Sequence, residues 1–191
     1  MMASGTWQNL APRHDARLSG WHGRDADSWH NLFYTGADDP RACVVIGEDS
    51  KPHLFCVETT HGGSRTTIQK NNRDVVATID WSAGDHLGRV TIGARHLHAS
   101  QLLGPGSSSS ARAFPSTTGK KCEWRRGGYD NLSYDLYAGS HVIATYRRFT
   151  RGTSVGPSHG ILEYIFDHDA FLVEVIVTLC LNRHLDAPRA F

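Results

Sequence analysis

The sequence contains little that would assign the protein to a compartment or to a cofactor. None of its four cysteines stands in a CxxC pair, so we expect four reduced thiols rather than a zinc site or a disulfide framework. Residues 1–20 lack the apolar stretch of a secretory signal, which favours an intracellular, cytoplasmic protein. No apolar run approaches the length of about 20 residues that a membrane-spanning helix requires.

An excess of either charge is also absent. Lys and Arg number 20 and Asp and Glu number 19, so the formal net charge is +1. Such a chain has no global field that would draw it to nucleic acid or to an acidic membrane. Any attraction to an anionic partner must therefore come from a local patch of basic residues.

Familiar catalytic motifs are missing as well. The sequence has no Gly-rich phosphate loop, no GxSxG elbow and no HExxH pair. His96 and His98 would lie on one face of a strand, as two metal ligands must, but the spacing supplies no third ligand. We therefore expect ordinary surface histidines, with no bound metal and no cofactor.

What the sequence does contain is a series of short strand-like runs separated by turns. The segment 75–81 alternates between two faces, as a half-buried antiparallel strand does. Such runs and 19 glycines predict a β-dominated fold, and 191 residues suffice for one domain with a sizeable core. The expected strands are 42–46, 52–59, 65–70, 75–81, 89–92, 121–126, 132–138, 141–149 and 160–166.

Two segments interrupt this pattern. Residues 1–28 are polar and without periodicity, so we expect a flexible N-terminal arm before a single domain of residues 29–191. Trp21 and Trp29 are each followed by a histidine, which leaves a lid over a pocket as an alternative role for the arm. Residues 103–119 are rich in Ser, Gly and Pro and predict a flexible surface loop.

The longest apolar run lies near the C-terminus, at 170–181. It is too short for a membrane span and too apolar for a surface element, which favours a helix buried on all sides. Acidic residues precede it and Arg183 and His184 follow it, an order that suits the helix dipole. Its many β-branched residues leave a buried central strand as the alternative.

A series of short motifs occurs in a fixed order along the chain, at 66–68, 76–81, 90–93, 122–125, 142–146, 175–178 and 182–183. Together these motifs resemble a fungal family of uncharacterised domains, abundant in basidiomycetes, over residues 31–186. That family is similar to the tubby C-terminal, LURP-one and phospholipid-scramblase barrels. The resemblance implies a closed antiparallel tubby-like β-barrel with a buried hydrophobic helix, here 171–181, threaded through its centre. It supplies no catalytic motif.

Two basic stretches form the strongest local charge feature. Arg and Lys side chains suit phosphate recognition, and the aromatic residues between them offer surface to an apolar body. Tubby barrels bind phosphoinositide headgroups through basic residues on strands, so the resemblance implies a similar site. The alternative is that these charges only protect strand edges. The candidate ligand-binding residues are Lys121, Trp124, Arg125, Arg126, Tyr146, Arg147 and Arg148.

Two acidic or basic side chains are candidates for catalysis. Glu174 interrupts the apolar run, and a carboxylate enclosed in an apolar cavity has a raised pKa suited to proton transfer. A salt bridge to an arginine on a strand, or exposure at a barrel mouth, is the simpler interpretation. His168 lies between Asp167 and Asp169, where it acts either as a general base or in capping the helix.

Three functions follow from these features. The first is an intracellular binding module for a hydrophobic or amphipathic ligand, with a phosphorylated lipid as one candidate. The second is a cofactor-independent isomerase or cyclase of fungal metabolism that uses a pocket at the barrel mouth. The third is a structural or interaction protein. In all three readings we expect no nucleic-acid partner.

Overall fold

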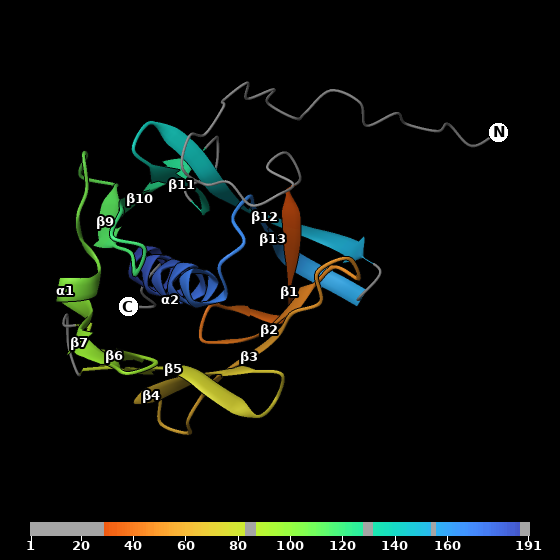
Figure 1. Ribbon diagram of the computed structural model, residues 1–191. Coiled ribbons are helices and arrows are strands. Elements are labelled where there is room, and N and C mark those ends of the chain that lie inside the picture. Colours follow the sequence, from red (N-terminus) through yellow and green to blue (C-terminus); the bar gives the residue numbers. More distant parts are fainter. Residues whose placement is uncertain (1–28, 83–86, 128–131, 154–155, 188–191) are drawn as a thin grey trace.

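The computed structural model describes residues 29–82, 87–127, 132–153 and 156–187, and the expected N-terminal arm lies outside these ranges. The described residues form thirteen strands and two helices (Figure 1). The first seven strands are β1 (His30–Asp39), β2 (Ala42–Gly47), β3 (Leu54–Thr59), β4 (Arg65–Lys70), β5 (Asp74–Asp80), β6 (Arg89–Ile92) and β7 (Arg95–His98). The other six are β8 (Gly104–Pro105), β9 (Arg112–Pro115), β10 (Lys121–Gly127), β11 (Ser133–Ala138), β12 (His141–Thr153) and β13 (Gly156–Tyr164). The helices are α1 (Ala99–Leu102) and α2 (Asp169–Asp186).

All thirteen strands belong to one antiparallel sheet. Its order is β7-β6-β5-β4-β3-β2-β1-β13-β12-β11-β10-β9-β8, so most neighbours in the sheet are also neighbours in the sequence. The exception is β1, which pairs with β13 and places Leu32 opposite Leu162. This pairing joins the two halves of the chain, and it brings the end of β1 beside the last strands before α2.

The apolar run near the C-terminus is a helix, and the sheet curves around it (Figure 1). All thirteen residues from Phe171 to Arg183 are buried. The inward positions of the strands alternate with solvent-facing ones, so that each strand adds apolar side chains to the space around α2. The helix expected at 171–181 is therefore confirmed, and the buried-strand alternative is wrong. Its β-branched residues are tolerated because burial on every side outweighs their low helix propensity.

One stripe of α2 is polar. Glu174, Thr178, Asn182 and Asp186 follow one another at intervals of four residues and so share a face. Each has a partner on β7, β9, β10 or β11. Thr178 accepts a hydrogen bond from the indole of Trp124 at 2.9 Å, and Asn182 accepts one from Arg112 at 2.9 Å. The polar stripe thus faces β9 and β10, and it fixes the rotation of the helix about its axis.

The sheet order ends at β7 and β8, and no strand pair among the described residues joins these two edges. The closed barrel that the resemblance implies is therefore not confirmed at the level of hydrogen bonding. The helix α1 and the side chain of Glu174 lie between these two edges, at the seam of the sheet. The short helix α1 packs against β7 and β9 (Figure 1). Glu174 forms an ion pair with Arg95 of β7 and accepts the backbone N–H of Thr117, beyond β9, at 2.9 Å.

The segment 103–119 differs from the flexible loop that its composition predicts. It contains β8 and β9, and Ala111, Ala113, Phe114 and Ser116 are buried. The ring of Phe114 stacks against Phe171 of α2 with 6.4 Å between the ring centroids. Serines and glycines surround short apolar pairs such as 113–114, so the composition of the segment does not reveal these strands.

All four cysteines are free thiols, and three of them are buried. Within the part of the chain that the structure describes, no helix is both long enough and apolar enough to cross a membrane.

The central position of α2 predicts a severe effect of a charge inside it. Val177 is fully buried, and an unpaired buried carboxylate costs several kcal/mol against a total stability of about 5 to 15 kcal/mol. We expect Val177→Asp to abolish the cooperative thermal transition followed by circular dichroism. Val75→Asp, at a side chain that is 57% exposed, is the matched control and should leave the transition in place. A Val177→Asp protein with an unchanged melting temperature would show that α2 is not the core.

The bridge across the seam predicts a rescue. Arg95→Ala leaves the fully buried Glu174 carboxylate without its cation, and we expect a loss of about 3 kcal/mol in the free energy of unfolding. Adding Glu174→Gln removes the buried charge and keeps an acceptor for Thr117, so the double variant should recover part of that loss. Denaturant unfolding of the wild type, both single variants and the double variant measures this. Additive effects of the two changes would contradict a direct coupling.

Candidate functional site

Two polar networks lie at the end of the sheet where α2 ends. We call them the Asp186 network and the Asp38 network, after the carboxylate in the centre of each. The Asp186 network consists of Asp186, Arg112, Arg126, Tyr134 and Asn182. The Asp38 network consists of Asp38, Arg148, Arg183, His159, Tyr34 and Tyr146. The two networks adjoin through Tyr134 and Tyr146, whose ring centroids are 6.4 Å apart.

The Asp186 network is fully satisfied. The carboxylate accepts hydrogen bonds from Arg112 at 2.8 Å and from the Tyr134 hydroxyl at 2.9 Å, and its ion pair with Arg126 is 2.7 Å long. Burial opposes ionisation of Asp186, but these hydrogen bonds outweigh it and lower its pKa. An acidic residue at a helix C-terminus is unfavourable on its own. The network therefore anchors the end of α2 to β9, β10 and β11.

In the Asp38 network, one carboxylate serves two arginines. Arg148 donates from Nε to Asp38 Oδ2 at 2.7 Å, and Arg183 donates from Nη2 to Asp38 Oδ1 at 2.9 Å. The guanidinium of Arg183 also lies over the rings of Tyr146 and Tyr34, at 4.9 and 5.7 Å from their centroids. With a neutral imidazole at His159, two arginines against one aspartate leave the network with one excess positive charge.

Four polar atoms of the Asp38 network are buried without a hydrogen-bond partner among the described residues. They are the hydroxyls of Tyr34 and Tyr146, Nε2 of His159 and Nη1 of Arg183. Buried polar groups in folded proteins are almost always paired, so four unpaired atoms in one place need an explanation. His159 Nε2 is 3.8 Å from Asp38 Oδ1, too far for a hydrogen bond.

The protonation of these groups makes most of them donors. Burial raises the pKa of Tyr34 and raises that of Tyr146 to about 12, so both stay protonated phenols near neutral pH. Burial lowers the pKa of His159, and Arg183 and Arg148 add to this effect against the opposing charge of Asp38. The imidazole is therefore neutral near pH 7. Two hydroxyls, a guanidinium and an imidazole are together suited to binding an anion.

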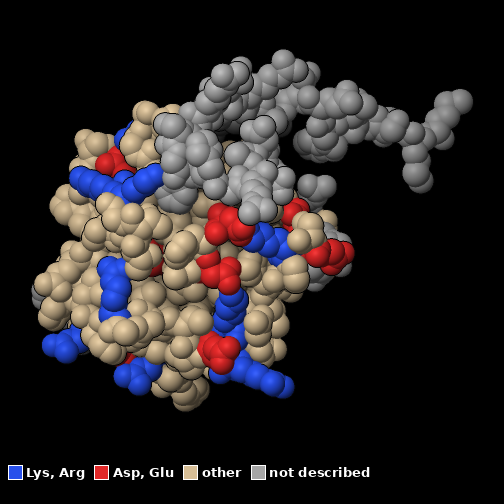
Figure 2. Space-filling view, viewed as in Figure 1, with Lys and Arg blue, Asp and Glu red and all other residues tan. Residues whose placement is uncertain are grey.

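The candidate ligand residues predicted from the sequence fall into different parts of the molecule. Lys121, Arg125 and Arg147 lie on solvent-facing positions of β10 and β12. Arg125 pairs with Glu123 at 2.6 Å and Arg147 pairs with Asp135 at 2.5 Å, so both charges are compensated locally. Figure 2 shows acidic and basic side chains interspersed over one face of the molecule.

Arg126 and Arg148 instead reach the end of α2, one in each network. Of the predicted cations, Arg148 alone belongs to the Asp38 network. It is also the more accessible of that network's two arginines, with 44% of its side chain exposed against 8% for Arg183.

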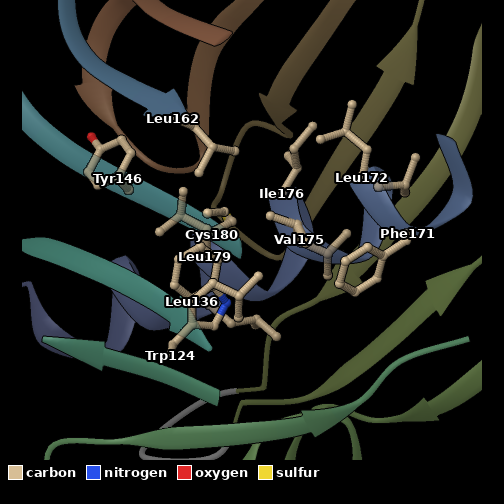
Figure 3. Packing of buried hydrophobic residues seen from close by; sticks show 14 of the residues in the cluster. Trp124, Leu136, Tyr146, Leu162, Phe171, Leu172, Val175, Ile176, Leu179 and Cys180 are labelled. Atoms are coloured by element: carbon tan, nitrogen blue, oxygen red, sulfur yellow. The ribbon is translucent and has the colours of Figure 1, made fainter. Parts of the chain in front are cut away.

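The two aromatic candidates are part of the core, which corrects the expectation of an aromatic surface between the cations. Trp124 is 1% exposed and Tyr146 is fully buried. Both lie among the side chains packed around α2 (Figure 3). The reason is strand alternation, since positions that flank outward-facing residues of β10 point inward.

The two catalytic candidates have structural partners. Glu174 is completely buried, but its carboxylate is engaged by Arg95 and Thr117, as the salt-bridge interpretation predicts. His168 is the N-cap of α2, and its Nδ1 accepts the backbone N–H of Phe171 at 3.2 Å. The capping interpretation therefore describes the observed geometry of His168.

His96 and His98 lie in the wall of a pocket of about 500 Å³ on the outer side of β6 and β7. His96 Nδ1 is 3.0 Å from the hydroxyl of Thr91. Within the described ranges, no group of three His, Cys, Asp or Glu side chains is arranged to hold a metal ion.

Sequence reasoning missed most of the Asp38 network. Tyr34, Asp38 and His159 stand in stretches without a motif. Arg183 is marked by its favourable position at the helix end and by the family motif 182–183, but neither feature identifies it as part of a site. One signal was present: an arginine directly after a run of buried residues must find partners inside the fold.

Comparisons with known proteins place the chain in a family without indicating its activity. A crystal structure of a protein from Arabidopsis thaliana resembles this one with a TM-score of 0.44 and 14% sequence identity, over 81% of this chain and 91% of the other. No protein of curated function matches the sequence significantly. Residues 38–185 match a family of unknown function, DUF6593, and the chain therefore belongs to the DUF6593 family.

Proposed function

We propose that the protein is a cytoplasmic binding module for an amphipathic ligand, and that the anionic head of this ligand binds in the Asp38 network. The observation that carries the proposal is the group of four buried, unpartnered polar atoms beside two arginines that share one aspartate. Such a group offers hydrogen bonds and one uncompensated positive charge, and both are what an anionic head requires.

The exposed arginines of the outer face are less suitable for an anionic head than the Asp38 network. Arg125 and Arg147 each have a carboxylate of their own, so they attract a distant anion only weakly, and salt screens them further. Arg183 is shielded from solvent, where a charge-assisted hydrogen bond is stronger than at the surface.

Other features support parts of the proposal. Four unpaired cysteines suit the reducing cytoplasm. The resemblance of the sequence motifs to a fungal family similar to the tubby-like barrels supports a lipid-like ligand. We propose further that the sheet behaves as a closed barrel, because α1 and the Glu174 bridge lie where strand pairing is missing. The enzyme alternative ranks lower, since Glu174 and His168 both have structural partners.

Neighbouring residues on β12 provide a matched test. Arg148 belongs to the Asp38 network, whereas Arg147 pairs with Asp135 on the opposite face of the strand. We expect the wild type to bind, at low salt, phosphatidylcholine vesicles that contain phosphatidylglycerol or oleic acid, and not phosphatidylcholine alone. Arg148→Glu should weaken this binding about tenfold or more in a sedimentation assay, because it reverses the accessible charge of the site. Arg147→Glu changes the net charge equally and should have little effect.

Melting temperatures of both variants show whether either change unfolds the domain. Equal weakening by Arg147→Glu would place the ligand on the outer surface of β12 and refute the proposed location. A wild type that ignores both kinds of anionic vesicle would refute the proposed function itself.

A further inference from the structure

We infer that the anionic head bound by the Asp38 network is a carboxylate, held by Tyr34, Tyr146, His159 and Arg183. This inference rests on the proposed function and narrows its ligand to a carboxylic acid with an apolar body.

The number of free donors matches a carboxylate. The two phenol hydroxyls, Arg183 Nη1 and the Nε2–H tautomer of His159 can each donate one hydrogen bond, and none of these atoms has a partner among the described residues. A carboxylate has two oxygens with about four lone-pair sites, so one such group would satisfy all four unpartnered atoms. Water is the other occupant that buried polar groups commonly bind, and a test must separate the two.

The charge of the network matches a single negative charge. Asp38 already neutralises one of the two arginines, and Arg183 donates to it at 2.9 Å through Nη2. A monoanion at Nη1 balances the remaining charge. A phosphate dianion at the same place would add a second charge beside the Asp38 carboxylate, and like charges in a poorly hydrated site repel strongly.

The network has one accessible side. The side chains of Arg148 and Asp38 are 44% and 31% exposed. Tyr34 is 3% exposed and Tyr146 is fully buried. In this proposal the head group enters beside the Arg148–Asp38 pair and reaches the buried donors, while the apolar body of the ligand stays on the outer side. Desolvation of the carboxylate is offset by the hydrogen bonds that it gains.

The test is a calorimetric titration of the full chain with sodium octanoate and sodium benzoate. Sodium phosphate and sodium chloride at equal ionic strength are the comparison ligands. We expect saturable binding of one carboxylate per chain, and binding of phosphate at least about tenfold weaker.

Phenylalanine variants test the site without breaking a described hydrogen bond. Tyr34→Phe and Tyr146→Phe each remove an unpartnered hydroxyl, so each should weaken carboxylate binding about tenfold and leave the melting temperature of the free protein equal or higher. Tyr134→Phe is the matched control. It removes the hydrogen bond to Asp186 and should lower the melting temperature while the affinity for the carboxylate stays the same.

The outcomes separate this inference from the proposed function. Phosphate binding as tight as carboxylate binding would overturn the carboxylate assignment, as would carboxylate binding that Tyr34→Phe and Tyr146→Phe leave unchanged. Binding to phosphatidylglycerol vesicles without any binding of octanoate or benzoate would overturn the inference and leave the proposed function standing. If neither vesicles nor carboxylates bind, both are wrong, and the four atoms hold water.

Discussion

Burial of α2 on every side is the constraint on which the rest of this structure depends. A helix with thirteen consecutive buried residues cannot be covered by a flat sheet, so the strands must curve around it and supply inward side chains from all directions. The same constraint governs the polar residues of the helix. None of the polar residues from Glu174 to Arg183 reaches bulk water, and each must find a partner on a strand or remain unpaired at a cost of a few kcal/mol.

Two kinds of polar residue result from this constraint. The stripe of Glu174, Thr178, Asn182 and Asp186 meets partners at the seam and beside it, and these contacts hold the helix where the sheet lacks strand pairing. Arg183 points to another side, toward β1 and β12, and one of its nitrogens stays unpaired among the described residues. The fold alone explains why the four residues of the stripe are polar, because each has a partner that holds the helix in place. The fold alone does not explain the unpaired polar atoms around Arg183, and for this reason we place the candidate site there.

Local patterns predicted α2 and nine of the strands but not β1, β7, β8 or β9, and the site depends on pairing that such patterns do not contain. The apolar run predicted α2 because its length and composition leave few other solutions, and alternation predicted strands such as β5. The sequence pattern did not predict β9, because a run of four serines precedes it. Asp38 and Arg148 meet because a bulged end of β1 lies beside β13 and β12, a long-range arrangement that spacing alone does not reveal. Strand alternation requires Trp124 to face inward if Arg125 faces outward, so the two residues of the basic cluster could not both line one surface site.

The position of α2 after all the described strands has a consequence for synthesis. A chain emerging from the ribosome forms its hairpins first, but these hairpins have no core until the helix has been made. The β1–β13 pair must also wait, because its partners are separated by more than a hundred residues and closing such a loop is slow. Nascent chains therefore expose the inward faces of their strands for most of translation, and their yield in a cell depends on chaperones that cover these faces until α2 arrives.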